Sequence, residues 1–349
     1  MIVDLFAGPG GWDEGLRLLD IHDVVGLEWD QAACDTAEAA GHVRHRVDVA
    51  EADPADYAGT VGLIASPPCQ AFSLAGKQAG LGVIDRLLEH VYGSIGGWAE
   101  PPASICGEDV RADLTLQPLR WVDDLRPEWV ALEQVPPVLP LWRAIGEVFA
   151  AWGYTVKVAK LNAANYGVPQ TRTRAVLVAS RVGPVSLPEP THYDVRRSGA
   201  LFGEPWVSMA DALGWPDDLL TVTGATADSV ARFAPRSTSM PAPPITGAGN
   251  TYAWTKDRPA TTIIGAGTVA APGHRCMSDE CCGKGPRRHM DDRSINVTVK
   301  QAAILQSFRP DYPWQGSKTK QYEQVGNAVP PLLARAVLAP IIVAREQAA

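Results

Sequence analysis

Cysteine, long apolar runs and excess positive charge are all scarce in this sequence. Six cysteines in 349 residues are too few for a disulfide scaffold, so we expect a reducing, cytoplasmic compartment. No run of about 18 apolar residues occurs, which argues against a membrane protein. The opening stretch, MIVDLFAGPGG, has no basic residue and carries Asp4 early, so we expect no signal peptide.

Positive charge is scarce overall but not everywhere. The formal net charge is −8, which argues against a nucleic-acid binder that depends on bulk charge. A local positive patch that attracts nucleic acid is still compatible with this composition, because the segment 284–300 has five basic and two acidic residues. Apolar residues make up 46% of the chain and charged residues 20%, enough for a sizeable core. The length fits two domains, or one large domain with an insertion.

Short apolar runs alternate with amphipathic stretches in the first half of the chain. This alternation predicts an α/β fold with a doubly wound, mostly parallel sheet. Two later strands are joined by a linker too short for a helical crossover, so we expect an antiparallel pair at the end of the sheet. The expected strands are 1–7, 23–29, 44–50, 62–66, 129–135, 154–163 and 174–180, with helices at 11–19 and 30–40.

The texture of the sequence changes after Ser180. Residues 183–272 are rich in proline, glycine, threonine and tryptophan, and they show few helical periods. This composition predicts a separate, irregular or β-rich domain. Helical periodicity returns near Val297 and again over 330–347.

The stretch DLFAGPGGWDEG places a strand, a glycine-rich turn and a helix in order. Gly8, Gly10 and Gly11 let the backbone pass close to a ligand, although a tight turn without a ligand would look the same. A dinucleotide fingerprint would need glycine or alanine where Asp13 stands, which counts against NAD.

Three residues follow the predicted strands at the same edge of the sheet. Glu28 could accept hydrogen bonds from both hydroxyls of a ribose, Trp29 could lie against an adenine, and Asp48 could accept from an adenine amino group. Each alone is equally well explained as a solvated residue at a strand end. Together, beside the glycine turn, they favour an adenosine site.

In the stretch LIASPPCQAFS, a predicted strand ends at two prolines, and a cysteine follows them at the carboxyl end of the strand. Pro67 and Pro68 restrict the backbone and so fix the direction of the Cys69 sulfur, whose thiolate could act as a nucleophile. Glu133 ends the next strand and could donate a proton. In QTRTR, Arg172 and Arg174 lie on one side of an extended segment, which suits a phosphate or a carbonyl oxygen, or simply a solvated strand face.

Five motifs, DLFAGPGG, PPCQ, EQV, QTRTR and QVGNAVPP, occur in an order that resembles the C5-specific DNA cytosine methyltransferases, from residue 2 to about residue 340. The resemblance implies a Rossmann-like fold that binds S-adenosylmethionine and releases S-adenosylhomocysteine. It implies a discontinuous catalytic domain, 1–184 plus 295–349, and a target-recognition domain, 185–294. The implied partner is double-stranded DNA. The sequence does not specify an oligomeric state, and we expect a monomer by default. The resemblance allows three biological settings: a restriction-modification system with a cognate restriction endonuclease, a phage, or an orphan enzyme.

The resemblance also implies residue roles. Cys69 would attack C6 of a flipped cytosine, Glu133 would bind N3, and Arg174 would contact the base carbonyl with Arg172 in support. Contacts to DNA would come from Gln70, Ser73 and Gln170. Contacts to the cofactor would come from Phe6, Ala7, Gly8, Gly10, Gly11, Glu28, Trp29, Asp48, Val49, Pro68, Leu114, Asn327 and Ala328.

Three features depart from the family pattern. The chain carries extra sequence over 83–106, to which the resemblance assigns no role. Gln134 stands where the family usually has asparagine, although the preceding acid is kept. A loop over 274–289 is rich in cysteine and histidine, but its spacing does not match a common zinc pattern, so we expect a plain insertion and no metal. Alternatives are an RNA methyltransferase, whose typical Cys-Phe-Thr segment is absent, an inactive DNA-binding relative, and an NAD-dependent oxidoreductase.

Overall fold

The protein is described from a computed structural model. It covers residues 1–68, 72, 84–101, 104–105, 110–194, 203–214, 220–221, 254–255, 260–261, 274–275, 288–289 and 298–348. Cys69, Gln70 and Ser73 lie outside these residues, as do the cysteines of the 274–289 loop. Within the described ranges, no three histidine, cysteine or acidic residues gather as metal ligands would.

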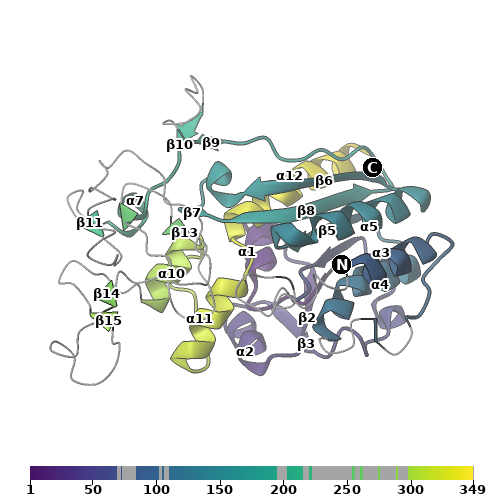
Figure 1. Ribbon diagram of the computed structural model, residues 1–349, viewed down its shortest axis with the longest axis horizontal. Helices are drawn as coiled ribbons and strands as arrows, with labels where there is room; N and C mark the ends of the chain where they lie inside the picture. Colours follow the sequence, from purple (N-terminus) through teal and green to yellow (C-terminus); the bar gives the residue numbers. More distant parts are fainter. Residues whose placement is uncertain are drawn as a thin grey trace.

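A seven-stranded sheet forms the centre of the fold, in the order β3-β2-β1-β4-β5-β8-β6 (Figure 1). The first five strands along the chain are parallel, and β8 runs antiparallel to both β5 and β6. The α/β prediction, including the antiparallel pair at the end of the sheet, is confirmed. The strands are β1 Ile2–Leu5, β2 Val24–Glu28, β3 Val43–Arg46, β4 Gly62–Ala65, β5 Trp129–Gln134, β6 Thr155–Asn162 and β8 Thr173–Ser180.

Each face of the sheet is covered by helices, because its strands are apolar on both sides. One core joins Val3, Leu63 and Leu132 to the helices α3, α4 and α5. The other joins Ile2 and Ile64 to α1 and α12. The helices of the sheet region are α1 Gly11–Arg17, α2 Gln31–Ala39, α3 Ile84–Gly93, α4 Gln117–Leu125 and α5 Leu139–Ala151, and α12 covers Pro331–Ala348.

The C-terminal segment returns to the start of the chain. The helices α10 (Val299–Leu305) and α11 (Lys318–Asn327) lead into α12, which packs on α1 beside β1 (Figure 1). The approach is close: a Cβ at Gly15 would lie 2.5 Å from the Cβ of Ala334. The packing agrees with the expected return of the C-terminus, while the domain boundaries themselves stay predictions.

One stretch of the described chain, Lys318–Arg345, is apolar and long enough to cross a membrane. Its helix is interrupted between Asn327 and Pro331, and half of its most apolar window is buried inside the fold. A core helix of a soluble protein passes the same test, so the segment is well explained by its packing on α1.

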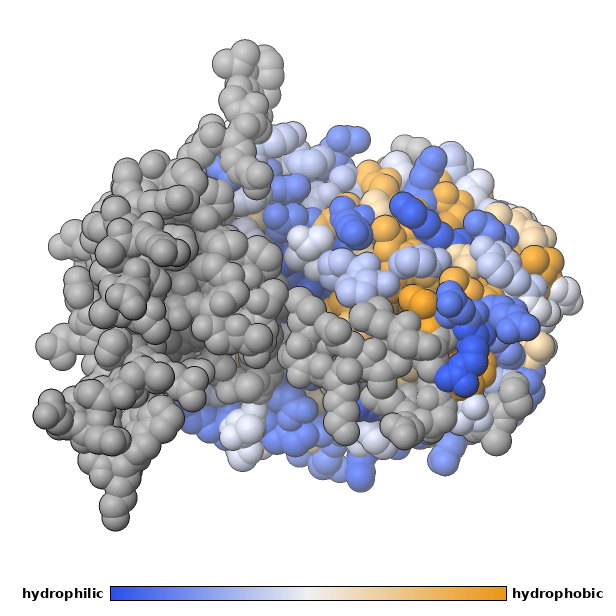
Figure 2. Space-filling view, viewed as in Figure 1, coloured by the Kyte–Doolittle hydropathy of each residue, from blue (hydrophilic) through white to orange (hydrophobic). Residues whose placement is uncertain are grey.

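The described residues between β8 and α10 form only short helices and strands. A parallel pair, β13 (Ala260–Thr261) with β7 (Gln170–Thr171), joins this region to the segment that precedes β8. On the face seen in Figure 2, hydrophobic and hydrophilic residues are interspersed over the part of the molecule that carries the central sheet. The remaining elements are β9 His192–Tyr193, β10 Glu204–Pro205, α7 Met209–Leu213, β11 Leu220–Thr221, β12 Trp254–Thr255, β14 His274–Arg275 and β15 Arg288–His289.

Candidate active site

The carboxyl ends of β1, β2, β4 and β5 meet at one edge of the sheet, where doubly wound proteins bind their ligands. Glu28 ends β2 at this edge. Its Oε2 accepts from the backbone N–H of Gly8 at 2.9 Å, and its Oε1 accepts from those of Trp29 and Asp30 at 2.9 and 2.8 Å. Burial raises the pKa of Glu28 above its ordinary value, although these donors act in the other direction. The carboxylate is therefore held in one orientation beside the glycine turn.

The glycine turn, residues 6–11, connects β1 to α1 through an unusual backbone. Phe6, Gly8 and Gly10 all have positive φ, at 60°, 56° and 108°. A Cβ at Gly8 would meet nothing within 4 Å, so that side of the turn is open. A Cβ at Gly11 would lie 2.2 Å from the carbonyl oxygen of Val329, so the start of α1 is pressed against the segment that follows α11. This contact brings the C-terminal motif to the turn.

The residues that follow β2 and β3 differ in how firmly they are held. Trp29 is 70% exposed, the highest fraction among the large hydrophobic residues described. Asp48 lies two residues beyond the end of β3, because the strand ends at Arg46, earlier than expected. Val49 is buried, and its carbonyl accepts from Arg120 Nη2 at 2.6 Å. An exposed ring and a fixed backbone thus flank Glu28.

The second half of the crevice contains the candidate catalytic groups. Glu133 lies near the end of β5, and its Oε1 is 2.8 Å from Nε of Arg174 on β8, with both side chains more than nine-tenths buried. Gln134 Nε2 donates to the carbonyl of Pro67 at 2.7 Å, and its Oε1 accepts from the N–H of Val135 at 2.6 Å. The link places the proline turn that precedes Cys69 beside the Glu133–Arg174 pair.

Two predicted site residues lie in the interior instead of facing the crevice. Arg172 is 2% exposed and donates to the carbonyl of Gly326 at 2.9 Å. Gln170 is fully buried and donates to Oε1 of Gln306 at 2.6 Å. Gln306 in turn donates to the carbonyls of Val325 and Ala328. Gln170 is thus buried and hydrogen-bonded in this structure, and its contact with DNA stays a prediction. Both residues instead fasten QTRTR to QVGNAVPP.

The remaining predicted cofactor residues come from several separate segments of the chain. Ala328 is buried at the end of α11, and Asn327 beside it is exposed. Leu114 is half-buried in a 3₁₀ helix, η3, Val110–Leu116. Ala7 is buried within the glycine turn, and Pro68 follows β4. Their positions agree with one crevice, and their contacts with a ligand stay predictions.

Sequence reasoning missed several charged and polar residues behind the turn. From the sequence, Asp13 counts only against a dinucleotide fingerprint, and Arg44 belongs to an ordinary predicted strand. The structure pairs them, with Nη2 of Arg44 2.7 Å from Oδ2 of Asp13 and both side chains buried. Tyr312 also reaches the turn, where its hydroxyl donates to the carbonyl of Pro9. No local signal marked Arg44, which lies between Val43 and His45 at the start of the predicted strand.

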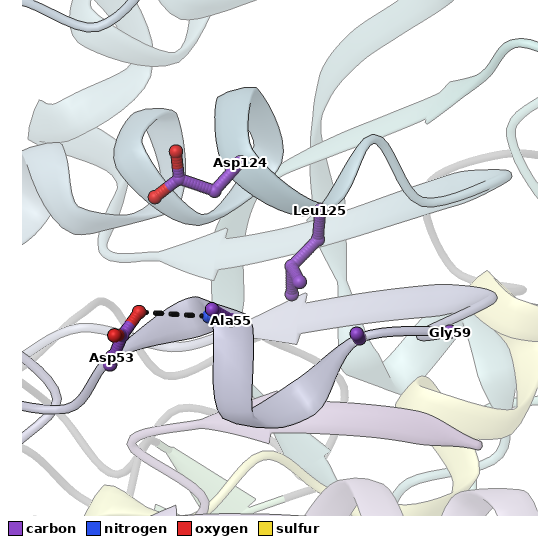
Figure 3. A pocket seen from close by; sticks show the side chains of 6 residues that line it. Asp53, Ala55, Gly59, Asp124 and Leu125 are labelled. Carbon is purple, nitrogen blue, oxygen red and sulfur yellow. Dashed lines mark hydrogen bonds between the residues drawn. The ribbon is translucent and has the colours of Figure 1, made fainter.

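A separate hollow lies at the opposite edge of the sheet (Figure 3). It has a volume of about 440 Å³ and lies at the amino ends of β4 and β5. Asp53 and Asp124 bring carboxylates to it, and the Asp53 carboxylate accepts from the N–H of Ala55. None of the residues that line it is a predicted site residue, so the carboxyl edge remains the candidate site.

The sheet order and its helical layers define a doubly wound α/β protein, with the predicted site residues at its carboxyl edge. The family model for C-5 cytosine-specific DNA methylase matches residues 1–88, 102–200 and 252–342. The chain therefore belongs to this family, whose members are methyltransferases dependent on S-adenosylmethionine.

Individual proteins resemble the chain over most of its length. The type II methyltransferase M1.HphI of Haemophilus parahaemolyticus is 28% identical, over 97% of this chain and 86% of its own. The type II methyltransferase M.DdeI of Desulfomicrobium norvegicum is 24% identical, over 96% and 87%. The Dnmt2 methyltransferase of Schizosaccharomyces pombe shares the fold with a TM-score of 0.57 and 14% identity, over 98% of this chain and 99% of its own.

Proposed function

We propose that this protein is a DNA (cytosine-5-)-methyltransferase that acts on a flipped cytosine within a specific duplex sequence. The observation that carries the proposal is the junction of β4, β5 and β8. There Gln134 ties the Pro67-Pro68 turn to the strand end that holds Glu133, opposite Arg174. The proline turn that leads in sequence to Cys69 is thus tied to the strand that carries an acid opposite a cation, which supports a function in a family whose members methylate cytosine.

The donor set of the crevice fits S-adenosylmethionine. A carboxylate fixed by three N–H groups suits the two ribose hydroxyls, and the open side of Gly8 leaves room for the methionine part. The exposed ring of Trp29 and the Asp48–Val49 segment would frame the adenine, with Phe6, Leu114, Pro68 and Asn327–Ala328 around them. When bound, the cofactor supplies an electrophilic methyl group on a sulfonium.

The residues of the chain would perform the remaining steps. C5 of cytosine is a weak nucleophile, and attack of the Cys69 thiolate on C6 turns the ring into an enamine that is nucleophilic at C5. Glu133 would share a proton with N3, so that negative charge does not build up on the ring, and Arg174 would hold the O2 carbonyl. After methyl transfer, loss of the C5 proton expels the Cys69 thiolate and restores the aromatic ring.

The base must leave the helix for this chemistry. C6 lies within the stack of a duplex, so the cytosine would be turned out of it at a cost of roughly a few kcal/mol. Gln70 and Ser73, which follow the proline turn in sequence, would then contact the DNA. The target sequence would be read by residues of about 185–294.

The relatives suggest a biological setting. Both sequence relatives described above are type II methyltransferases. We therefore propose a restriction-modification role in the cytoplasm, for a monomeric enzyme paired with a cognate endonuclease.

Sequencing of methylated cytosine tests the proposal directly. Plasmid DNA from cells that express the wild-type chain or Cys69→Ser would be read after bisulfite conversion. We expect 5-methylcytosine at one short motif with the wild type and none with the variant. Unmethylated DNA from wild-type cells, or methylation that survives Cys69→Ser, would overturn it.

A further inference from the structure

A buried ion pair lies against the glycine turn. Arg44 on β3 meets Asp13 on α1 through two contacts, Nη2–Oδ2 at 2.7 Å and Nη1–Oδ1 at 3.2 Å. The guanidinium lies across β2 above Gly26, where a Cβ would come within 2.4 Å of Nη1. Burial opposes the charge on both groups, but their attraction lowers the pKa of Asp13 and raises that of Arg44. Both groups are therefore charged at neutral pH.

The pair has an additional contact that a purely internal ion pair would not need. Nε of Arg44 donates to the carbonyl of Gly8 at 3.2 Å. The N–H of the same glycine donates to Glu28 at 2.9 Å. Gly8 is therefore fixed at both of its polar groups, and a continuous line of hydrogen bonds runs from Arg44 through Gly8 to Glu28.

Tyr312 holds the next carbonyl of the turn. Its hydroxyl donates to Pro9, and its ring is buried against Phe308 and Trp314, with ring centroids 4.7 and 4.9 Å away. A Cβ at Gly10 would lie 2.7 Å from the Tyr312 hydroxyl, so the turn also leaves space for this side chain. Two successive carbonyls are thus bound by side chains that come from outside the turn.

The turn needs external support because its backbone is strained. Phe6 has a left-handed conformation, at φ 60°, which is unfavourable for a residue that carries a Cβ. Gly8 and Gly10 add two more positive φ values within five residues. Such a segment keeps one shape only when its surroundings determine it.

We propose that Arg44 and Tyr312 are positioning residues for the methyl donor: by binding the Gly8 and Pro9 carbonyls they hold the glycine turn and Glu28 in the geometry that receives S-adenosylmethionine. Asp13 orients the guanidinium of Arg44. This inference rests on the proposed function, and it predicts an effect on cofactor affinity over and above any effect on folding.

The chain offers a matched control for the tyrosine. Tyr154 is buried to the same degree as Tyr312, at 4% against 5% exposed, and it also donates to a proline carbonyl, that of Pro127 at 2.7 Å. Pro127 precedes β5 at the opposite edge of the sheet. Tyr312→Phe and Tyr154→Phe therefore remove the same kind of bond, one beside the cofactor turn and one far from it.

The test compares cofactor affinity with stability in the full chain. Calorimetry would give the Kd for S-adenosylhomocysteine, steady-state methylation would give kcat and the KM values for donor and DNA, and thermal unfolding would give Tm without ligand. We expect Tyr312→Phe to raise the Kd and the donor KM about threefold to tenfold, and Arg44→Lys tenfold or more. The DNA KM and kcat at saturating donor should change less than threefold. Tyr154→Phe should lower Tm comparably and leave the Kd unchanged.

Each outcome decides the question. Unchanged Kd in Tyr312→Phe and Arg44→Lys, measured well below their Tm, would show that these contacts only support folding. Equal increases of Kd in Tyr312→Phe and Tyr154→Phe would also overturn the inference. A wild-type chain that binds no S-adenosylhomocysteine and transfers no methyl group would overturn the proposed function, and this inference with it.

Discussion

The two halves of the crevice are held by different kinds of interaction. On the β1–β3 side, buried charges fix the backbone: Glu28 accepts three N–H groups, and the Asp13–Arg44 pair reaches the Gly8 carbonyl. On the β4–β8 side, a neutral amide joins Gln134 to Pro67, and Glu133 forms an ion pair with Arg174. Substitutions on the β1–β3 side should therefore change the affinity for the methyl donor, whereas substitutions on the β4–β8 side should change the rate of methyl transfer.

The largest effect is expected from Glu133→Gln. The substitution keeps the shape of the side chain but removes its proton chemistry, and general acid–base groups contribute about 10²- to 10⁴-fold to rates. We expect kcat to fall by about that factor while the Kd for S-adenosylhomocysteine stays within twofold. Transfer of a tritiated methyl group to plasmid DNA measures it.

Glu128→Gln is the control for that substitution. Glu128 lies just before β5 at the opposite edge of the sheet, where it forms an ion pair with Arg345. Its removal should leave kcat unchanged. A Glu133→Gln enzyme with wild-type kcat would remove the acid from the mechanism.

The cofactor half is tested by Glu28→Gln. Hydrogen bonds to a charged group contribute about 1.5–3 kcal/mol, so we expect the Kd for S-adenosylhomocysteine to rise roughly tenfold to hundredfold. At saturating donor, kcat should recover to near the wild-type value. Calorimetry with Glu38→Gln, an exposed acid on α2, provides the reference. A fall in kcat that excess donor does not restore would contradict the division between the two halves.

A smaller effect is expected from Gln134→Asn, which installs the residue usual in the family. The shorter amide cannot reach both Pro67 and the Val135 N–H as Gln134 does, and a lost hydrogen bond is worth about 1 kcal/mol. We expect kcat to fall about fivefold to tenfold with donor Kd unchanged. Single-turnover methylation isolates this step. Full activity in the variant would mean that the proline turn keeps its place without this bond.

Much of the fold was predictable because local pattern determines it. Strands buried on both faces, such as β4 and β5, read as continuous apolar runs, and ordered motifs place Glu28 and Glu133 at one edge. The predicted strand over 44–50 was too long at its end, because Val47 and Val49 continue the apolar alternation after β3 has ended at Arg46.

The support of the site could not be predicted, because it depends on contacts between distant segments. Tyr312 and Pro9 are 303 residues apart, and no local periodicity relates them. The alternation in QTRTR placed Arg172 and Arg174 on one side, yet Arg174 meets Glu133 while Arg172 reaches Gly326. Which partner each guanidinium finds is decided by tertiary packing.

The smallest expected effect concerns Asp4, a fully buried acid on β1 beside the cofactor half. Both of its carboxylate oxygens lack a hydrogen-bond partner among the described residues. Burial, and next the charge of Asp13, raise the pKa of Asp4 well above its ordinary value. The folded chain therefore keeps a proton that the unfolded chain releases near pH 4, and stability should fall as pH rises from there to the raised pKa.

Asp4→Asn removes this titration while nearly preserving the shape of the side chain. One proton of difference corresponds to at most about 1.4 kcal/mol of stability per pH unit. We expect the decline of Tm between pH 5 and pH 8 to be shallower in Asp4→Asn than in the wild type. Asp56→Asn, which changes an exposed acid, should leave the curve parallel to the wild type. If Asp4→Asn is also parallel, Asp4 is ionised in the fold, and the negative charge beside the glycine turn exceeds what Arg44 alone would balance.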